Sequence, residues 1–180
     1  MVDLIKTCRN VFLVGIICSM ALFGCSKISE TSEDKTINAA QSNTLEKVKN
    51  GQLEGVSIGI GATKKEVIDK LGKPIEGRNS EYGFSAYYDG FNFQFEDYAD
   101  SFDAVSDSSK VVIINADPTT VGLTGNPQEV KKLLGEPSRE FTDDISDNNF
   151  ILEYSVDNLL LWVNFDTIEN QVKYITLRIK

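Results

Sequence analysis

The sequence contains no histidine, and its 180 residues include only three cysteines. Without histidine the chain has no imidazole to bind a metal ion or act as a general base, which excludes the common serine and cysteine hydrolase triads. It also lacks the motifs G-x-x-x-x-G-K-[ST] and G-x-S-x-G, which are typical of phosphate-binding loops and α/β-hydrolase nucleophiles. We therefore expect a protein that is not an enzyme and that has no cofactor.

Basic residues are scarce, with 18 lysines and arginines against 27 aspartates and glutamates and a formal net charge of -9. Nucleic-acid binding depends on lysine and arginine meeting phosphates, so this charge balance argues against such a partner. The hydrophobic fraction of 41% is typical of a chain that folds around a core.

An uncharged run from Val11 to Gly24 follows a short basic start. A membrane-spanning helix needs about 20 apolar residues, so the length of this run favours a signal peptide. The run ends in Leu22-Phe23-Gly24-Cys25, which resembles the lipobox of bacterial lipoproteins. The resemblance implies a signal peptide over residues 1–24, cleavage between Gly24 and Cys25, and a lipid with fatty acids such as palmitate on the Cys25 sulfur.

A lipid on Cys25 would place the protein on the extracytoplasmic face of the cell membrane, since two acyl chains hold a domain there stably. The acidic domain itself would be repelled by anionic lipid, so we expect the lipid to be its only membrane contact. Two alternatives to the lipoprotein interpretation are an ordinary secretory signal with an incidental cysteine and an uncleaved anchor. The polar segment from Cys25 to residue 43 is interpreted as a flexible tether, and a surface helix is the alternative there.

The rest of the chain contains one pattern twice, which predicts a first repeat over residues 44–117 and a second over residues 118–180. Each copy starts a helix with a capping box, at Thr63 or Asn126, and ends it at a Gly-x-Pro sequence. Gly72 and Gly135 are the predicted left-handed residues at these helix ends. The aligned pairs are Gly59/Gly122, Glu66/Glu129, Val67/Val130, Leu71/Leu134, Gly72/Gly135 and Pro74/Pro137.

A β-hairpin is predicted after each helix. Residues 83–88 and 91–95 flank Asp89-Gly90, a pair that predicts a type I′ turn, and residues 150–156 and 159–165 flank Asp157-Asn158. A third strand is predicted at residues 111–116 and 172–179. The predicted buried faces are Phe84, Ala86, Tyr88, Phe91, Phe93 and Phe95 in the first hairpin and Phe150, Leu152, Tyr154, Val156, Leu159, Leu161, Val163 and Phe165 in the second.

These elements predict an α+β fold. It would consist of two tandem repeats, each a helix plus a three-stranded antiparallel sheet, with the helices packed on one face of the sheet.

The lipobox, the polar tether and the repeated G-x-T-x-x-E-V-x-x-x-L-G-x-P pattern together resemble the YjgB-like family of uncharacterised lipoproteins of Gram-positive, spore-forming bacteria. The resemblance covers residues 44–180 and implies the fold without implying a catalytic role. A more distant resemblance is to the β-lactamase inhibitory protein and to the small lipoprotein of the outer-membrane barrel-assembly machine. Those proteins act by binding other proteins, which is an analogy at the level of fold alone.

Acidic residues cluster in two segments, at residues 96–107 and 140–147. Calcium prefers several oxygen ligands from one loop, so Asp100 and Asp103 are weak candidates for a calcium site. Neither segment has the spacing of an EF-hand, and a solvated acidic loop is the simpler interpretation, so no metal site is predicted. An extracytoplasmic sensor that binds a small ligand or calcium remains the alternative function.

The outward face of the predicted hairpins carries large side chains where solvent is expected. Ile151, Leu160 and Trp162 lie on this side of the second hairpin and Tyr87 on that of the first. Exposed aromatic residues beside polar groups are typical anchors for a partner, so Trp162, Leu160 and Tyr87 are the candidate partner-binding residues. The alternative is that this face packs against the other repeat or a loop. The leading hypothesis is a non-enzymatic module that binds or assembles with an unidentified protein.

Overall fold

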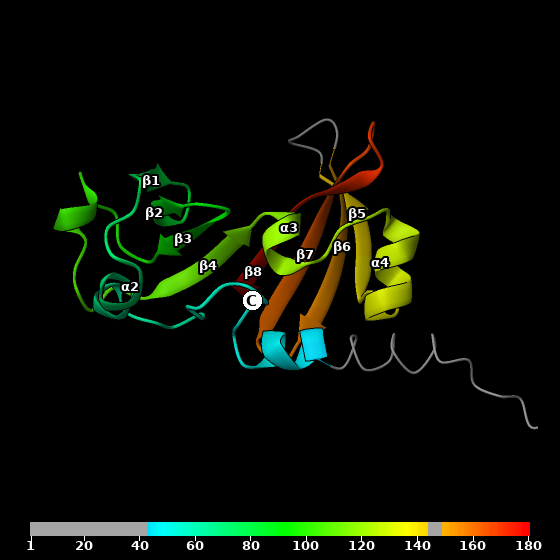
Figure 1. Cartoon of the computed structure of the whole chain (residues 1–180), viewed down its shortest axis with the longest axis horizontal. Coiled ribbons are helices and arrows are strands. Elements are labelled where there is room, and N and C mark those ends of the chain that lie inside the picture. The colour runs from blue at the N-terminus through cyan, green and yellow to red at the C-terminus, as the bar shows by residue number, and fades with distance from the viewer. Residues whose placement is uncertain (1–42, 144–148) are drawn as a thin grey trace, which may run out of the picture. The chain divides into compact units, whose positions relative to one another are not determined.

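The computed structural model describes residues 43–143 and 149–180, which lie within one compact unit of the chain (Figure 1). Both the predicted signal peptide with its cleavage site at Gly24 and the predicted lipidation site Cys25 lie outside the described residues. Within the described ranges, none of the helices has the length and apolar character needed to cross a membrane.

The fold is α+β. Residues 43–49 are helical, and the elements that follow are α2 (Lys64–Leu71), β1 (Glu76–Ser80), β2 (Gly83–Tyr88), β3 (Phe91–Phe95), the 3-10 helix η1 (Phe102–Ala104), β4 (Val111–Ala116), α3 (Pro118–Val121), α4 (Pro127–Leu134), β5 (Arg139–Thr142), β6 (Asn149–Val156), β7 (Leu159–Asp166) and β8 (Gln171–Ile179).

The eight strands of the described residues form one antiparallel sheet in the order β1-β2-β3-β4-β8-β7-β6-β5. Each half of the sheet is a meander of four neighbouring strands that follows one capped helix, and β4 pairs with β8 where the halves meet (Figure 1). The expectation of three strands per unit was therefore wrong. The additional strands, β1 and β5, are short, mostly exposed edge strands without an alternating apolar pattern.

The two helix starts confirm the predicted capping boxes. The Glu66 side chain accepts a hydrogen bond from the Thr63 backbone N–H at 2.7 Å, and Glu129 does the same for Asn126 at 2.9 Å. Each box satisfies two backbone donors that a helix start otherwise leaves unpaired. At the helix ends Gly72 and Gly135 have φ of 76° and 82°, as expected for glycine, but their ψ values lie in the extended range rather than in the left-handed helical well.

The first hairpin turn differs from its prediction. A type I′ turn needs positive φ at both central residues, whereas in this turn only Gly90, at 77°, has it. The register nevertheless matches the prediction, with Tyr88 opposite Phe91 and Val156 opposite Leu159. The predicted inward residues all join or pack against one buried core, which confirms the two predicted apolar faces.

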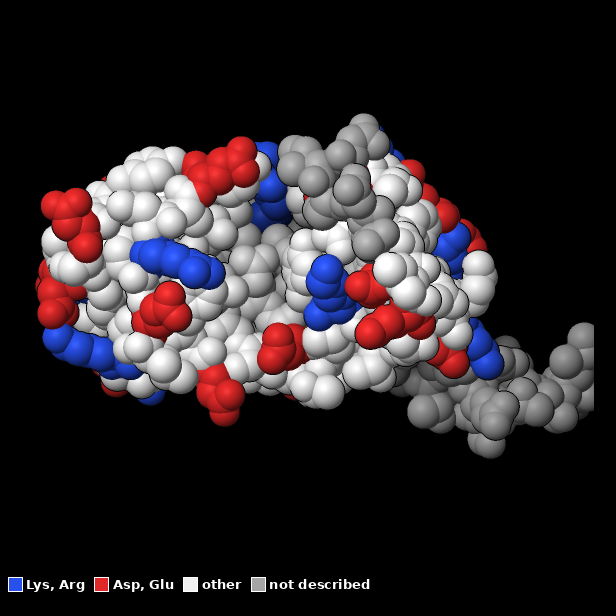
Figure 2. All heavy atoms as spheres, turned by 90° about the horizontal axis from the view of Figure 1, so that it is seen from above, with Lys and Arg blue, Asp and Glu red and all other residues white. Residues whose placement is uncertain are grey.

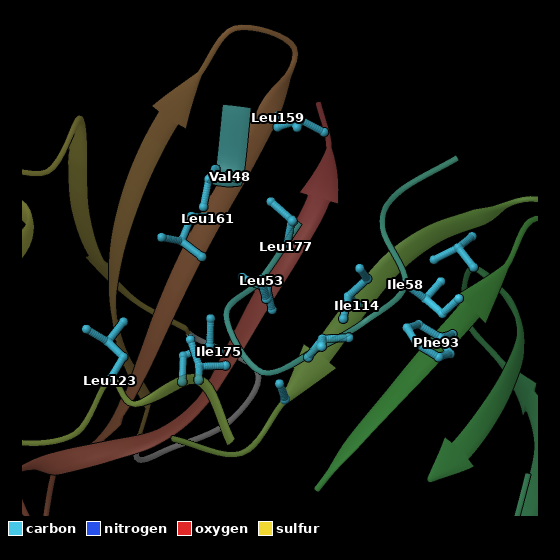
Figure 3. Close-up of a cluster of buried hydrophobic side chains, with 14 of the residues drawn as sticks. Val48, Leu53, Ile58, Phe93, Ile114, Leu123, Leu159, Leu161, Ile175 and Leu177 are labelled. Atoms are coloured by element: carbon cyan, nitrogen blue, oxygen red, sulfur yellow. The ribbon is translucent and has the colours of Figure 1, made fainter. Parts of the chain in front are cut away.

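The segment over residues 43–62, which we call the strap, crosses the core from one half of the sheet to the other. Val48 lies beside Leu161 of β7, whereas Ile58 lies beside Phe93 of β3 (Figure 3). At its end the strap pairs with the start of β4, where the Val111 N–H donates to the Ala62 carbonyl at 2.8 Å. The strap therefore contributes apolar side chains to the core of both halves.

Candidate functional site

Two rows of side chains cross the sheet on the face opposite the core, because directly paired residues of an antiparallel sheet point to the same side. The first row is Glu76, Tyr87, Asn92, Asn115, Thr176, Trp162, Glu153 and Arg139. The second row is Arg78, Ser85, Gln94, Ile113, Arg178, Leu160 and Ser155. All three predicted anchors, Trp162, Leu160 and Tyr87, belong to these rows.

Two arginines and three aromatic rings form a continuous series of contacts along part of this face. The Arg139 guanidinium lies 4.5 Å from the Phe141 ring centre, and the Phe141 ring meets the Trp162 ring edge to face at 5.8 Å. The Arg178 guanidinium lies 5.0 Å from the Trp162 ring and 5.0 Å from the Tyr82 ring. We call these five residues the cation–aromatic ladder.

Trp162 is held in place at its polar edge as well as on its faces. Its indole N–H donates a hydrogen bond to the Glu153 carboxylate at 2.8 Å, from the directly paired position on β6. The side chain is half-buried. An indole fixed in this way loses little conformational freedom when a partner covers it.

The structure brings two of the predicted anchors together and separates the third. Leu160 is half-buried and pairs with Arg178, next to Trp162 on the same strand face. Tyr87 lies in the other half, where the Arg78 guanidinium covers its ring at 4.8 Å and donates from Nε to its hydroxyl at 3.1 Å.

The expectation of an open outer face was wrong for two neighbours of these anchors. Ile151 is only 3% exposed and Asn164 only 1%. Ile151 is covered because β5, which the sequence pattern did not predict, pairs Phe141 with it on this side of the sheet. Asn164 lies between its paired residues Ile151 and Tyr174.

Several buried polar atoms of the second row have no hydrogen-bond partner within the described part of the chain. They are the Ser85 hydroxyl, the Gln94 side-chain oxygen and Nε of Arg178. Buried polar groups in folded proteins are almost always paired, so these atoms are places where water or a partner group would be stabilising. The neighbouring row is better satisfied, since Thr176 donates to Asn115 at 2.7 Å and Asn115 donates to Asn92 at 3.1 Å.

The candidate calcium residues lie near one another beside η1, and one of them is already paired. Lys73 Nζ lies 2.7 Å from Oδ1 of Asp103, and this ammonium holds the pKa of that carboxyl below its ordinary value. Asp100 lines the same small pocket of about 240 Å³. Over residues 43–143 and 149–180, no three or more acidic or cysteine side chains are grouped so that they could hold a metal ion.

The arrangement of charge on one face of the molecule does not favour an anionic partner there. Figure 2 shows acidic and basic side chains interspersed over one face of the molecule, with no continuous basic patch on that face. A phosphate backbone or an anionic membrane surface would require such a patch.

Comparison with protein families identifies the relatives of this chain. The family model described as "Domain of unknown function (DUF4309)" matches residues 41–177. The chain belongs to the DUF4309 family. No curated protein matches it.

Comparison with solved structures found two matches to this DUF4309 chain. One is a DUF4309 family protein, YjgB, from Bacillus subtilis subsp. subtilis str. 168, with a TM-score of 0.58, 15% identity, and coverage of 79% of this chain and 97% of that chain. The other is an extracellular protein containing an SCP domain from Bacillus anthracis str. Ames, with a TM-score of 0.47, 16% identity, and coverage of 67% and 44%. At these identities the first likeness shows a shared fold.

Most of the ladder in this DUF4309 chain was missed from the sequence. Arg178 could have been found, because it lies in the strand predicted at residues 172–179, where successive side chains point to opposite faces of the sheet. Arg139 and Phe141 could not have been found from the sequence, because the strand that contains them was not predicted. Tyr82 lies in the turn between β1 and β2, and only the tertiary structure brings it over Arg178.

Proposed function

We propose that the protein is a membrane-anchored, extracytoplasmic lipoprotein that acts as a non-enzymatic protein-binding module. Its contact surface would be the cation–aromatic ladder with Leu160 beside it, and Tyr87 would be a separate anchor on the same face of the sheet. The observation that carries this proposal is the continuous series of cation–aromatic and ring–ring contacts from Arg139 through Trp162 to Tyr82.

The composition of the ladder favours a protein partner. Arginine, tryptophan and tyrosine are enriched among the residues that dominate protein–protein binding energy. In the ladder each guanidinium stacks on a ring, so its charge stays available while its rotamers are restricted. A partner that offers carboxylates beside apolar groups would satisfy both the arginines and the rings.

The anchor rests on the sequence around Cys25. A diacylglyceryl group there would hold the protein at the membrane, and residues 26–43 would separate the folded domain from the lipid surface. The length and polarity of that segment support a tether that lets the ladder reach a partner outside the bilayer.

We also infer that the two halves arose as copies of one unit, with α2 and α4 on the same face of the sheet. Matching details support this inference. The Tyr88 hydroxyl donates to the Gly72 carbonyl at 3.0 Å, and Tyr154 donates to Gly135 at 3.1 Å, so each half ties its second strand to its own helix end. Each half also has a register shift where its third strand pairs with its fourth.

The test is crosslinking in intact cells, with the full-length chain expressed with its own leader and captured partners identified by mass spectrometry. Trp162→Ala and Arg139→Ala should lose specific partners that the wild type captures. Ile168→Ala is the matched control, because Ile168 is a large apolar residue, 77% exposed, outside the ladder.

Identical partner sets for the wild type and both ladder variants, with thermal unfolding unchanged, would refute the ladder as the contact surface. The anchor is tested separately by labelling with a fatty-acid probe. The wild type should incorporate the label and Cys25→Ala should not.

A further inference from the structure

A pocket of about 460 Å³ opens at the end of the sheet where the β2–β3 turn, the end of β4 and the start of β8 meet. Its lining includes the side chains of Tyr87, Asn92, Asn115, Asp117 and Tyr174. This volume lies within the range of small-molecule sites, which is about 300–1,000 Å³. The pocket shares no residue with the cation–aromatic ladder, although Tyr87 belongs both to its lining and to the proposed partner-binding anchors.

The walls of the pocket are firmly connected. The Asp117 N–H donates to the Gly90 carbonyl at 2.8 Å, which joins the start of α3 to the β2–β3 turn. The turn and the helix are so close that a Cβ on Gly90 would lie 2.4 Å from the Thr120 hydroxyl. A ligand would therefore enter a site that is already formed, with little ordering of the chain on binding.

Two polar groups in the pocket are available to a ligand. Asp117 occupies the N-cap position of α3, yet its carboxylate caps no backbone N–H. The Asn92 amide oxygen accepts from Asn115, while its amide nitrogen donates to no acceptor within the described ranges. The pocket thus presents a charged acceptor and a free double donor next to phenol rings.

The chemistry of the lining narrows the class of ligand. Among the described residues, no lysine or arginine belongs to the lining, and the nearby Arg78 guanidinium is already engaged by the Tyr87 ring and the Glu76 carboxylate. A phosphate or carboxylate would therefore meet Asp117 without a free cation in the lining. Burial raises the pKa of Tyr174, so its phenol stays neutral at physiological pH. Hydroxyl groups of a sugar would match both the carboxylate and the amide, and the apolar face of a sugar ring would pack on the tyrosine rings.

We propose that this pocket binds a neutral sugar residue, either free or at the end of a glycan. Asp117 and Asn92 would bind adjacent hydroxyls, and Tyr87 and Tyr174 would contact the ring. The inference does not depend on the proposed protein-binding role.

The test is titration of the purified full-length chain with neutral hexoses and N-acetylhexosamines, followed by protein NMR. At least one of these sugars should produce saturable shifts, and Asp117→Ala should weaken its binding by about tenfold or more, since it removes a charged hydrogen bond. Asp89→Ala is the matched control. It removes the same charge at an exposed position of the adjacent turn, outside the lining, and should bind like the wild type.

Titration with a linear trimer of the sugar that binds distinguishes a free sugar from the terminal residue of a glycan as the natural ligand. Tighter binding of the trimer assigns the pocket to a glycan, and equal binding assigns it to a free sugar. Three results would overturn the proposal: no saturable shift with any sugar of the panel, equal sugar affinity in Asp117→Ala and wild type, or saturation by tetramethylammonium alone, which would indicate a cation site.

Discussion

Gly55 in the strap has no room for a side chain, which makes it a sensitive probe of how the strap meets α3. Its φ is +71°, and a Cβ there would lie 2.0 Å from the backbone oxygen of Thr120. A real Cβ does not come closer than 3.0 Å to such an atom, so Gly55→Ala would force the strap and α3 to move apart. Overpacking of this kind lowers the free energy of unfolding by about 1–3 kcal/mol.

Gly122 is the matched control, because its φ is also +71° but nothing lies within 4 Å of the position that a Cβ would take there. Alanine in the left-handed region costs about 1–2 kcal/mol. Because alanine has fewer backbone conformations than glycine in the unfolded chain, the substitution also regains about 0.4–1 kcal/mol of that loss. Gly122→Ala should therefore lose about 1 kcal/mol of unfolding free energy, and Gly55→Ala about 1–3 kcal/mol more.

Urea unfolding followed by the fluorescence of Trp162, the single tryptophan, measures both variants. The m-value should stay unchanged, so that the shift in midpoint reports stability alone. Equal losses in the two variants, within about 0.5 kcal/mol, would refute the close approach of the strap to α3.

Three further predictions concern other parts of the fold. Lys64 is 4% exposed, and its ammonium donates a hydrogen bond to the Val105 carbonyl at 2.6 Å. Lys64→Met should therefore lower the free energy of unfolding, measured in urea, by about 1–3 kcal/mol. It should also speed amide hydrogen exchange over residues 102–109. Thr63→Ala and Asn126→Ala should each lower the free energy of unfolding by about 1 kcal/mol, because each removes one of two matching capping boxes. Clearly unequal losses would argue against equivalent halves. Burial raises the pKa of Tyr88 from 10.0 to about 12. The stability that neutral Tyr88 contributes is thus complete below about pH 10 and falls as the pH rises towards 12. The free energy of unfolding of Tyr88→Phe, measured by urea unfolding at a series of pH values, should therefore decrease less between pH 10 and 12 than that of the wild type.

Local signals in the sequence predicted the helices and hairpins well. Thr63 with Glu66, and Asn126 with Glu129, satisfy helix starts within four residues of chain, so no distant contact is needed to recognise them. The alternation around Asp157-Asn158 likewise predicted which side of β6 and β7 is buried, because a register error would expose every apolar residue of the hairpin.

The edge strands and the turn geometry could not be predicted in this way. Glu76–Ser80 and Arg139–Thr142 are short and polar, and they are strands only because β2 and β6 offer free edges. The Asp89-Gly90 turn takes positive φ only at the glycine. Its backbone hydrogen bond to Asp117, made from a distant segment, is a constraint that no local pattern contains.

The sequence by itself determined the two capped helices, the paired hairpins and the face of each that turns inward, because these depend on residues within a few positions of each other. Only the tertiary structure decided that Tyr82, Arg178, Trp162 and Phe141 contact one another in series. It also decided that Asp117, Tyr87 and Tyr174 line one pocket. Both arrangements join strands from different parts of the chain, and strand order in a sheet is set by the burial of the whole core rather than by any one segment.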